Sequence, residues 1–240
     1  MLAWQEIKHR YRRSMLGPLW LTISTGVMLV AMGPLYGRIL HQDLGEYFAY
    51  LAISFVTWLL LASLINDACQ TFITAEGYIK DTKLPLTTHA LRCVWRNLLI
   101  FGHNLLIVLL ILLFYRPGNP ALYPLSVVGM VLVAFNGLWL GILLGLLCTR
   151  FRDVAQLVAS VVQIGFFLTP VLWKAEMLGE RRWIAEVNPL YHALEVVRAP
   201  LLGRAPEALS WATVLATTVI GSMVTMSLFS RYRARIAYWV

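Results

Sequence analysis

The chain has 240 residues, of which 59% are hydrophobic and only 13% are charged, and its mean hydropathy is +0.70. Soluble domains carry about 25% charged residues, so this composition excludes an ordinary soluble domain, a disordered chain and a disulfide-stapled secreted module. The net charge of +8 would suit nucleic acid in a soluble protein, but here its distribution indicates membrane topology.

Six stretches lack Asp, Glu, Lys and Arg over roughly the 20 residues that a helix needs to cross a bilayer. A turn rich in proline and glycine, residues 117–120, precedes the fourth of them. The sequence therefore predicts one all-α transmembrane domain over 1–240. Its spans are expected at about 17–37, 47–66, 97–115, 123–148, 154–173 and 208–230.

Six spans place both termini on one side, and the positive-inside rule predicts that this side is the cytoplasm. Thirteen of the 20 Lys and Arg residues lie in the segments on that side, with only five acidic residues among them. The other side carries seven residues of each sign, so the whole excess charge follows from topology. We therefore expect a multi-pass protein with both termini in the cytoplasm and no nucleic-acid partner.

Residues 1–16, ahead of the first span, have the pattern of an amphipathic helix. Trp4, Ile7, Tyr11 and Met15 recur at spacings of three and four residues, and basic side chains occupy the other directions. This pattern predicts a helix lying along the cytoplasmic leaflet. A plain basic anchor with no further role is the alternative.

The second feature is the long cytoplasmic connection 67–91. Apolar residues, among them Tyr78, Ile79 and Leu84, alternate with charged ones, and Pro85 ends the segment. The connection is long for a simple link between two spans, and apolar groups on a cytosolic loop suggest docking to a partner protein. A helix resting on the bilayer surface is the alternative.

No sequence motif gives the chain its own source of energy or catalysis. A G-x-x-x-x-G-K-[ST] phosphate loop, HExxH, GxSxG and an acidic metal cluster are all missing. The cores of the spans also lack Asp, Glu, Lys and Arg, which ion-coupled transporters place at membrane depth. We therefore expect no cofactor, metal or catalytic residue on this chain, and expect energy to arrive through a cytosolic contact.

Two further patterns concern packing. Gly137, Gly141 and Gly145 form overlapping G-x-x-x-G units, which let another helix approach closely, either within the chain or from another copy. In the outer segment 174–207, Asn188 followed by Pro189 predicts the start of an amphipathic helix. That helix either lies at the outer interface or re-enters the bilayer part-way.

Five motifs occur in the order known from the membrane subunits of ABC-type polysaccharide exporters. They are YRRSMLGPLW at 11–20, RFRD at 150–153, Thr169-Pro170, NPL at 188–190 with Arg198, and RIAYW at 235–239. The chain thus resembles a type-2 ABC exporter permease over almost its whole length. The entrance motif and the NPL segment resemble O-antigen exporters most, and capsule and teichoic-acid exporters share the pattern.

The resemblance implies a homodimer in the bacterial cytoplasmic (inner) membrane that works with two copies of a separate P-loop ATPase. ATP and Mg would be held by that partner, and the cargo would be a lipid-linked glycan. It also assigns roles to three groups of residues. They are a coupling segment (Glu76, Tyr78, Ile79, Lys80, Asp81, Lys83, Leu84 and Pro85), a gate helix near the lipid phosphate (Arg10, Tyr11, Arg12 and Arg13) and an outer gate (Asn188, Pro189 and Arg198).

A glycan conduit at the dimer interface would suit aromatic side chains, because their rings contact the apolar faces of sugars without holding any one sugar tightly. The candidates are Tyr36, Phe55, Trp58, Phe135, Trp139, Phe166 and Phe167. Each could instead pack inside the protein or face lipid. The arginines near the N-terminus could likewise attract either a substrate pyrophosphate or membrane headgroups.

Two other classes of protein stay open from the sequence. A membrane enzyme acting on a lipid-linked sugar would need paired carboxylates or a His–acid pair, and the best such cluster is His41, Asp43 and Glu46. A solvated turn is the simpler account of these three residues. The remaining alternative is a structural scaffold subunit.

Overall fold

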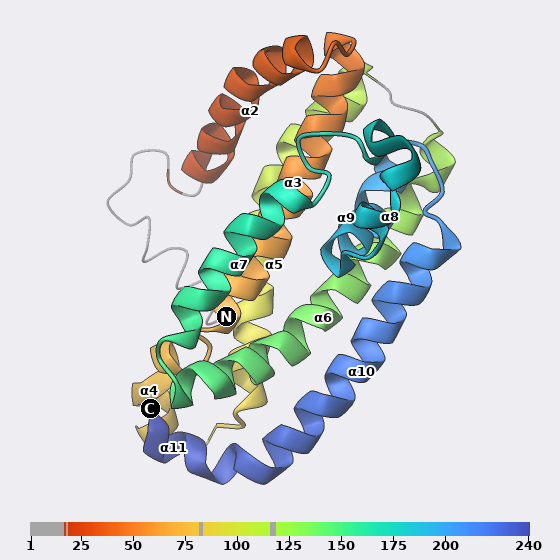
Figure 1. Cartoon of the computed structure of the whole chain (residues 1–240). Helices are drawn as coiled ribbons and strands as arrows, with labels where there is room; N and C mark the ends of the chain where they lie inside the picture. Colours follow the sequence, from red (N-terminus) through yellow and green to blue (C-terminus); the bar gives the residue numbers. More distant parts are fainter. Residues whose placement is uncertain (1–16, 18, 82–83, 116–118) are drawn as a thin grey trace.

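The computed structural model describes residues 17, 19–81, 84–115 and 119–240, and every regular element in these ranges is helical (Figure 1). Labels start at α2, and the gate residues Arg10, Tyr11, Arg12 and Arg13 and coupling residue Lys83 lie outside the described ranges. The long helices are α2 (Leu19–Ile39), α3 (Leu44–Ala68), α5 (Thr87–Tyr115), α6 (Tyr123–Arg150), α7 (Val154–Leu168) and α10 (Ala208–Tyr232). The short ones are η1 (Ile73–Ala75), α4 (Glu76–Asp81), η2 (Pro120–Leu122), η3 (Ala175–Arg181), α8 (Trp183–Glu186), α9 (Pro189–Leu201), η4 (Arg233–Arg235) and α11 (Ile236–Trp239).

Five of the described helices, α2, α3, α5, α6 and α10, are long and apolar enough to cross a membrane. The predicted span 154–173 is wrong at its end, because α7 stops at Leu168 after 15 residues. At 1.5 Å per residue this helix is about 22 Å long, less than the roughly 30 Å hydrocarbon core. The cause is Pro170, which disfavours the helical conformation of Thr169 before it, and Thr169 is extended (φ −86°, ψ 137°).

The third helix of the bundle also starts earlier than predicted. α5 begins at Thr87, ten residues before the predicted span 97–115, because its first turns carry charged residues that a hydropathy search excludes. One of these charged residues is Arg96, whose positive charge is balanced by Asp67, because its guanidinium donates to Asp67 Oδ2 over 2.9 Å. Asn97 Nδ2 donates to the same oxygen over 3.0 Å. The predicted connection 67–91 is therefore shorter, because α3 runs to Ala68 and α5 starts at Thr87.

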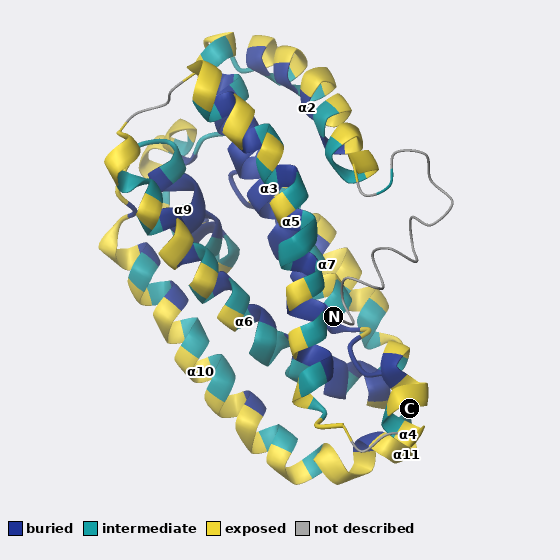
Figure 2. Ribbon diagram, turned by 180° about the vertical axis from the view of Figure 1, so that it is seen from behind, coloured by how far each residue is buried: buried dark blue, intermediate teal, exposed yellow. Residues whose placement is uncertain are grey.

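Helix α3 is the centre of the bundle, as the dark run along it in Figure 2 shows. Asp43 caps its first turn, accepting hydrogen bonds from the backbone N–H of Gly45 (2.9 Å) and of Glu46 (3.1 Å). Tyr47 and Leu51 are fully buried in a core that α2, α5, α6, α7 and α9 complete. Helix α10, by contrast, lies on the outside of the bundle in both views.

The glycines of α6 pack inside the chain, which decides between the two alternatives given above. A Cβ on Gly137 would lie 2.9 Å from the Leu64 side chain of α3, and one on Gly145 would lie 3.0 Å from Phe72. Gly141 faces Ala90 of α5. All three glycines are buried, so this face of α6 serves close packing within one copy.

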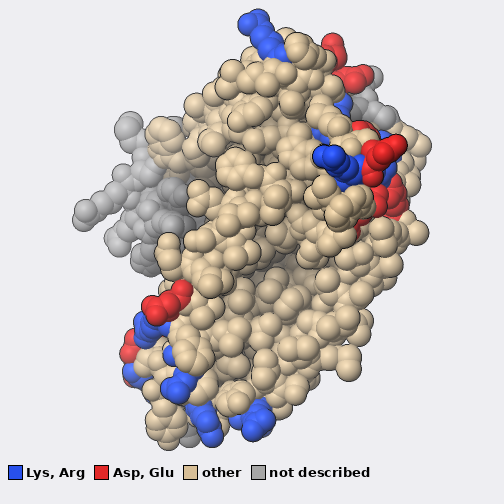
Figure 3. Space-filling view, in the orientation of Figure 1, with Lys and Arg blue, Asp and Glu red and all other residues tan. Residues whose placement is uncertain are grey.

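Two different ends result from this arrangement. Figure 3 shows Lys and Arg gathered at the end formed by α4, η4 and α11, which we call the basic end. At that end Phe72, Leu146 and Ile236 form a small core of their own. The opposite end, closed by η3, α8 and α9, carries charges of both signs.

Candidate transport and coupling sites

Helix α4, at the basic end, carries most of the predicted coupling segment. Its residues run from Glu76 to Asp81, and Leu84 and Pro85 follow beyond the undescribed pair 82–83. Ile79 packs against the Phe72–Leu146–Ile236 core, whereas Tyr78 and Leu84 are exposed. The helix thus presents one apolar side to the bundle and leaves other side chains at the surface.

Two contacts of Lys80 hold α4 in place. One is a salt bridge within the helix, and the other is a hydrogen bond to the C-terminal turn. Lys80 Nζ lies 2.6 Å from Glu76 Oε1 and also donates to the Val240 backbone oxygen over 3.0 Å. The hydrogen bond from Lys80 lowers the pKa of the Glu76 carboxyl, and its positive charge acts in the same direction. Since Val240 follows α11, the end of the described chain is tied directly to α4.

Four of the seven aromatic conduit candidates meet where α3 packs against α7. The Phe166 ring lies 6.2 Å from Phe55, 5.7 Å from Trp58 and 5.3 Å from Phe167, measured between ring centroids. Phe55 and Trp58 are buried in the core, Phe166 is half-buried, and Phe167 is exposed. Within this cluster, Phe167 is therefore the ring that a ligand can reach without any rearrangement.

The other three candidates lie elsewhere. Trp139 packs between α6 and α10, where its ring covers Gly221 and its Nε1 donates to Asn136 Oδ1 over 2.9 Å. Phe135 is exposed and lines a shallow groove between α5 and α6. Tyr36 of α2 packs on the main core. The structure does not bring these rings to the α3–α7 cluster.

A polar stripe on α7 is a feature that the sequence analysis did not single out. Gln156, Ser160, Gln163 and Phe167 recur at spacings of four, three and four, and all are exposed. The opposite side of α7 holds its buried residues, Val162 and Gly165. Amide side chains are costly in hydrocarbon, so a stripe of this kind indicates a surface that meets water or another polypeptide. Its helical spacing was readable from the sequence.

At the opposite end, the predicted outer-gate residues organise the start of α9. Asn188 caps α9 by accepting from the Leu190 backbone N–H over 3.0 Å, and Pro189 occupies the first turn. The Asn188 amide also donates to Thr169 Oγ1 over 2.8 Å. One side chain therefore joins the beginning of α9 to the end of α7.

The segment after α7 is irregular, and side chains from α3 and α9 satisfy its carbonyl groups. Tyr47 Oη donates to the Leu172 oxygen over 2.7 Å, and Tyr50 Oη lies 2.9 Å from the Pro170 oxygen and 2.7 Å from the Trp173 oxygen. Arg198 Nη1 donates to the same Pro170 oxygen over 2.5 Å. Non-helical backbone is tolerated in a membrane protein where the protein itself supplies such partners.

Arg198 is the centre of this network and is only 2% exposed. Its Nη1 also donates to Tyr50 Oη (2.8 Å) and Ser54 Oγ (3.1 Å), and its Nε and Nη2 donate to Glu195. The Glu195 carboxylate beside it balances the charge of this buried guanidinium. The residue is thus a fixed, paired cation.

The cluster that an enzyme would need is used differently. The Asp43 carboxylate caps α3, as described above, and His41 has a left-handed backbone (φ 51°) in the preceding turn. Among the residues that the structure describes, no three His, Cys, Asp or Glu side chains lie close enough to hold a metal ion. These contacts fit the interpretation of His41 and Asp43 as part of a turn, whereas Glu46 lies in the first turn of α3.

Taken together, the fold defines a multi-pass, all-α membrane protein with the short helix α4 at its basic end and a polar stripe on the shorter apolar helix α7. The model of the ABC-2 type transporter family matches residues 1–202, and the chain belongs to this family. As a member, it is a component of a transporter.

Curated relatives match almost the whole chain at low identity. An O-antigen export system permease protein RfbA from Klebsiella pneumoniae is 24% identical over 242 residues, covering 97% of this chain and 91% of that protein. The protein of the same name from Myxococcus xanthus is 22% identical over 243 residues, covering 98% and 92%.

Proposed function

We propose that the chain is the membrane subunit of an ATP-driven exporter that moves a lipid-linked polysaccharide, O-antigen-like or capsular, across the bacterial cytoplasmic membrane. The observation that carries the proposal is that the relatives named as O-antigen export permeases align with nearly the whole length of both chains. Membership of the ABC-2 family supports the same reading of the architecture.

In this proposal two copies of a P-loop ATPase, which hold ATP and Mg, bind at the basic end and push on α4. The coupling residues are those named from the sequence, with Tyr78 and Leu84 exposed for contact. Movement of α4 would pass into the bundle through Ile79, which packs on the Phe72–Leu146–Ile236 core. The basic end would face the cytoplasm, as the positive-inside rule requires.

The conduit would form between two copies of this chain. The polar stripe of α7 supports this arrangement, because an amide-bearing face that is exposed in one copy needs a polar neighbour in the assembled transporter. Phe167 at the end of the stripe offers a ring to the apolar face of a sugar. The network around Arg198 and Asn188 would hold the outer end closed until the cargo arrives.

Near the N-terminus, Arg10, Arg12 and Arg13 would attract the pyrophosphate of the cargo, and Tyr11 would sit beside it at the interface. These roles rest on the resemblance and on the chemistry of Arg with phosphate oxygens. No specific observation favours the membrane-enzyme alternative, because Asp43 serves as a helix cap.

The test is affinity purification of the tagged chain from its own host in mild detergent, followed by native mass spectrometry. We expect two copies of this chain with two copies of a P-loop ATPase. A parallel strain in which the catalytic residue of that ATPase is replaced should keep the complex and lose surface polysaccharide. A chain that arrives without an ATPase, or surface polysaccharide that persists in the second strain, would contradict the proposal.

A further inference from the structure

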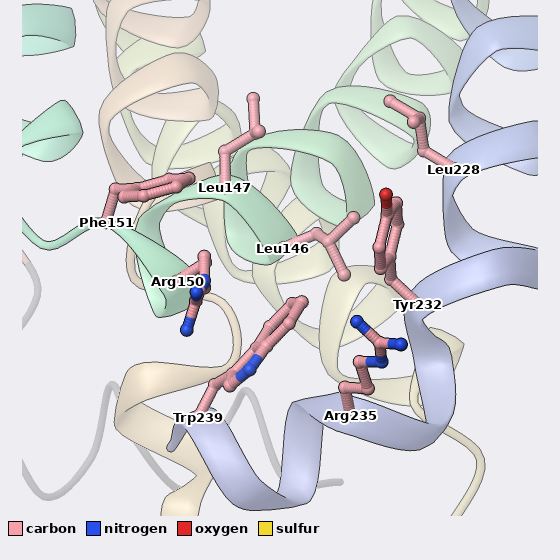
Figure 4. Close-up of a pocket in the computed structure, with 8 residues that line it drawn as sticks. All are labelled: Leu146, Leu147, Arg150, Phe151, Leu228, Tyr232, Arg235 and Trp239. Carbon is pink, nitrogen blue, oxygen red and sulfur yellow. The ribbon is translucent and has the colours of Figure 1, made fainter.

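A cavity at the basic end is lined by residues to which the proposed transport gives no role (Figure 4). Its volume is about 540 Å³, and it lies where the ends of α6 and α10 meet the C-terminal turn. Leu146, Leu147 and Leu228 form its apolar part. The remaining lining residues are two arginines and three aromatic residues: Arg150, Arg235, Phe151, Tyr232 and Trp239.

The two arginines are held by aromatic rings. The Arg150 Cζ atom lies 5.3 Å from the centroid of the Trp239 ring and 5.6 Å from that of Phe151. The Arg235 Cζ atom lies 5.8 Å from the centroid of the Tyr232 ring, and Tyr232 and Trp239 are themselves 6.1 Å apart. Figure 4 shows the two guanidinium groups on either side of Trp239.

The described part of the chain leaves both guanidinium groups without an acidic partner. Within the described ranges, no carboxylate lies within salt-bridge distance of Arg150 or Arg235, whereas Arg96, Arg182 and Arg198 each have at least one. A cation–π contact positions an arginine over a ring and leaves its N–H donors available to an anion. The cavity therefore joins two available cationic groups to an apolar wall.

The position of the cavity at the end of a membrane helix bears on which kind of molecule it can hold. The cavity opens at the end of α10, the least buried of the candidate spans, where Ile220 and Val224 are exposed about two turns and one turn before Leu228. An acyl chain lying along this face would place its headgroup at the level of the arginines. Basic pockets between membrane helices at the cytoplasmic interface bind anionic lipid headgroups, and tryptophan and tyrosine favour the same depth.

We propose that this cavity binds the phosphate of an anionic phospholipid from the leaflet at the basic end. The two guanidinium groups would contact the phosphate oxygens, and Leu147 and Leu228 would contact the first part of an acyl chain. Leu146 belongs to the core on which Ile79 of α4 packs, and Trp239 packs against the same core, so a bound lipid would brace the coupling helix. This inference holds whatever cargo the transporter carries.

The test is a lipid titration of the full chain in detergent, followed by native mass spectrometry. The probes are dioleoyl phosphatidylglycerol and dioleoyl phosphatidylcholine, which share their acyl chains and differ in the headgroup, anionic phosphoglycerol against zwitterionic phosphocholine. We expect tighter binding of phosphatidylglycerol, and a loss of affinity on the order of tenfold in the double variant Arg150→Gln/Arg235→Gln. The matched control is Arg152→Gln/Arg233→Gln, which removes the same charge from exposed neighbours outside the cavity and should leave the affinity within about twofold.

A second measurement keeps both arginines in place. A p-benzoylphenylalanine at position 147 should crosslink to phosphatidylglycerol in preference to phosphatidylcholine. Equal yields from the two lipids, or unchanged phosphatidylglycerol affinity in the cavity variant, would overturn the proposal.

Two other occupants are outcomes of the same experiment. If a polyprenyl pyrophosphate displaces phosphatidylglycerol at a far lower concentration, the cavity belongs to the cargo and the proposal fails. If the cavity variant loses a copurifying ATPase while its phosphatidylglycerol affinity is unchanged, the cavity is a protein contact and the proposal also fails.

Discussion

Arg198 shows how one side chain can hold three elements of a membrane protein together. It sits on α9, donates to Tyr50 and Ser54 of α3, and reaches the Pro170 oxygen just after α7. The unwound end of α7 exposes carbonyl groups that would otherwise be unsatisfied in an apolar environment. Pro170 ends α7, and Arg198 donates a hydrogen bond to a carbonyl oxygen that the end of the helix leaves without a helical partner.

Replacing this arginine should destabilise the fold strongly. In Arg198→Met the largely buried Glu195 carboxylate loses its partner, and breaking a buried pair from one side costs about 3–5 kcal/mol. We expect a clearly lower melting temperature in detergent. The control is Arg204→Met, which removes an exposed pair with Glu176 and should cost at most about 1 kcal/mol. Equal melting of the two variants would contradict the structural role given to Arg198.

Among the helices, α6 depends most on small residues. Gly129 lies against the backbone of α9, where a Cβ would come within 2.7 Å of the Val196 carbonyl carbon. A backbone neighbour gives way less easily than the end of a flexible side chain. The glycine therefore sets the distance between α6 and α9, and α9 in turn carries Arg198.

Gly129→Ala should therefore force α6 and α9 apart and destabilise the protein by about 1–3 kcal/mol. The matched control is Gly102→Ala on α5, where the added Cβ meets nothing within 4 Å. Alanine is the better helix former by about 0.5–1 kcal/mol, so the control should be neutral or slightly stabilising. Thermal unfolding in detergent separates the two, and a stable Gly129→Ala would show that α9 can shift freely.

The polar stripe on helix α7 permits a test of whether this helix lines the proposed conduit. Gln163→Trp adds a large ring to an exposed position, so the fold should tolerate it, but a conduit lined by this stripe would be narrowed. We expect normal membrane levels and reduced surface polysaccharide. Met223→Trp on the exposed face of α10, measured in parallel, should leave export unchanged. Normal export by Gln163→Trp would remove α7 from the conduit.

Hydropathy predicts the helices well and their ends poorly. Each of the six apolar stretches is helical over most of its length, because a run of about 20 apolar residues has few other solutions in a membrane. The first turns of α5 were missed because they contain the charged residues Arg92 and Arg96. Arg96 is paired with Asp67, a contact between distant segments that a hydropathy search does not detect. Phe55 and Trp58 could be named from the sequence. That they meet Phe166, while Trp139 packs on Gly221 instead, depends on how each helix is rotated about its axis, and the sequence alone does not give that rotation.

Over the whole molecule, the two ends are built for different tasks. The end closed by α9 is fixed by a hydrogen-bond network centred on a buried arginine. At the basic end, a short helix is attached to the bundle by a small apolar core and by the contact of Lys80 with Val240. A force applied to α4 therefore reaches α6 and the C-terminal turn directly, and reaches the other end only through the long helices.

This arrangement makes a specific prediction about energy coupling. Gly77 of α4 has nothing within 4 Å of its Cβ direction, so Gly77→Trp should fold normally and place a large ring on the surface that would meet the ATPase. We expect the variant to reach the membrane, to lose a copurifying ATPase and to abolish surface polysaccharide. Glu180→Trp adds the same ring at an exposed position at the opposite end and should change neither readout. If Gly77→Trp instead kept both the ATPase and export, α4 would not be the docking helix, and the partner would have to bind elsewhere on the basic end.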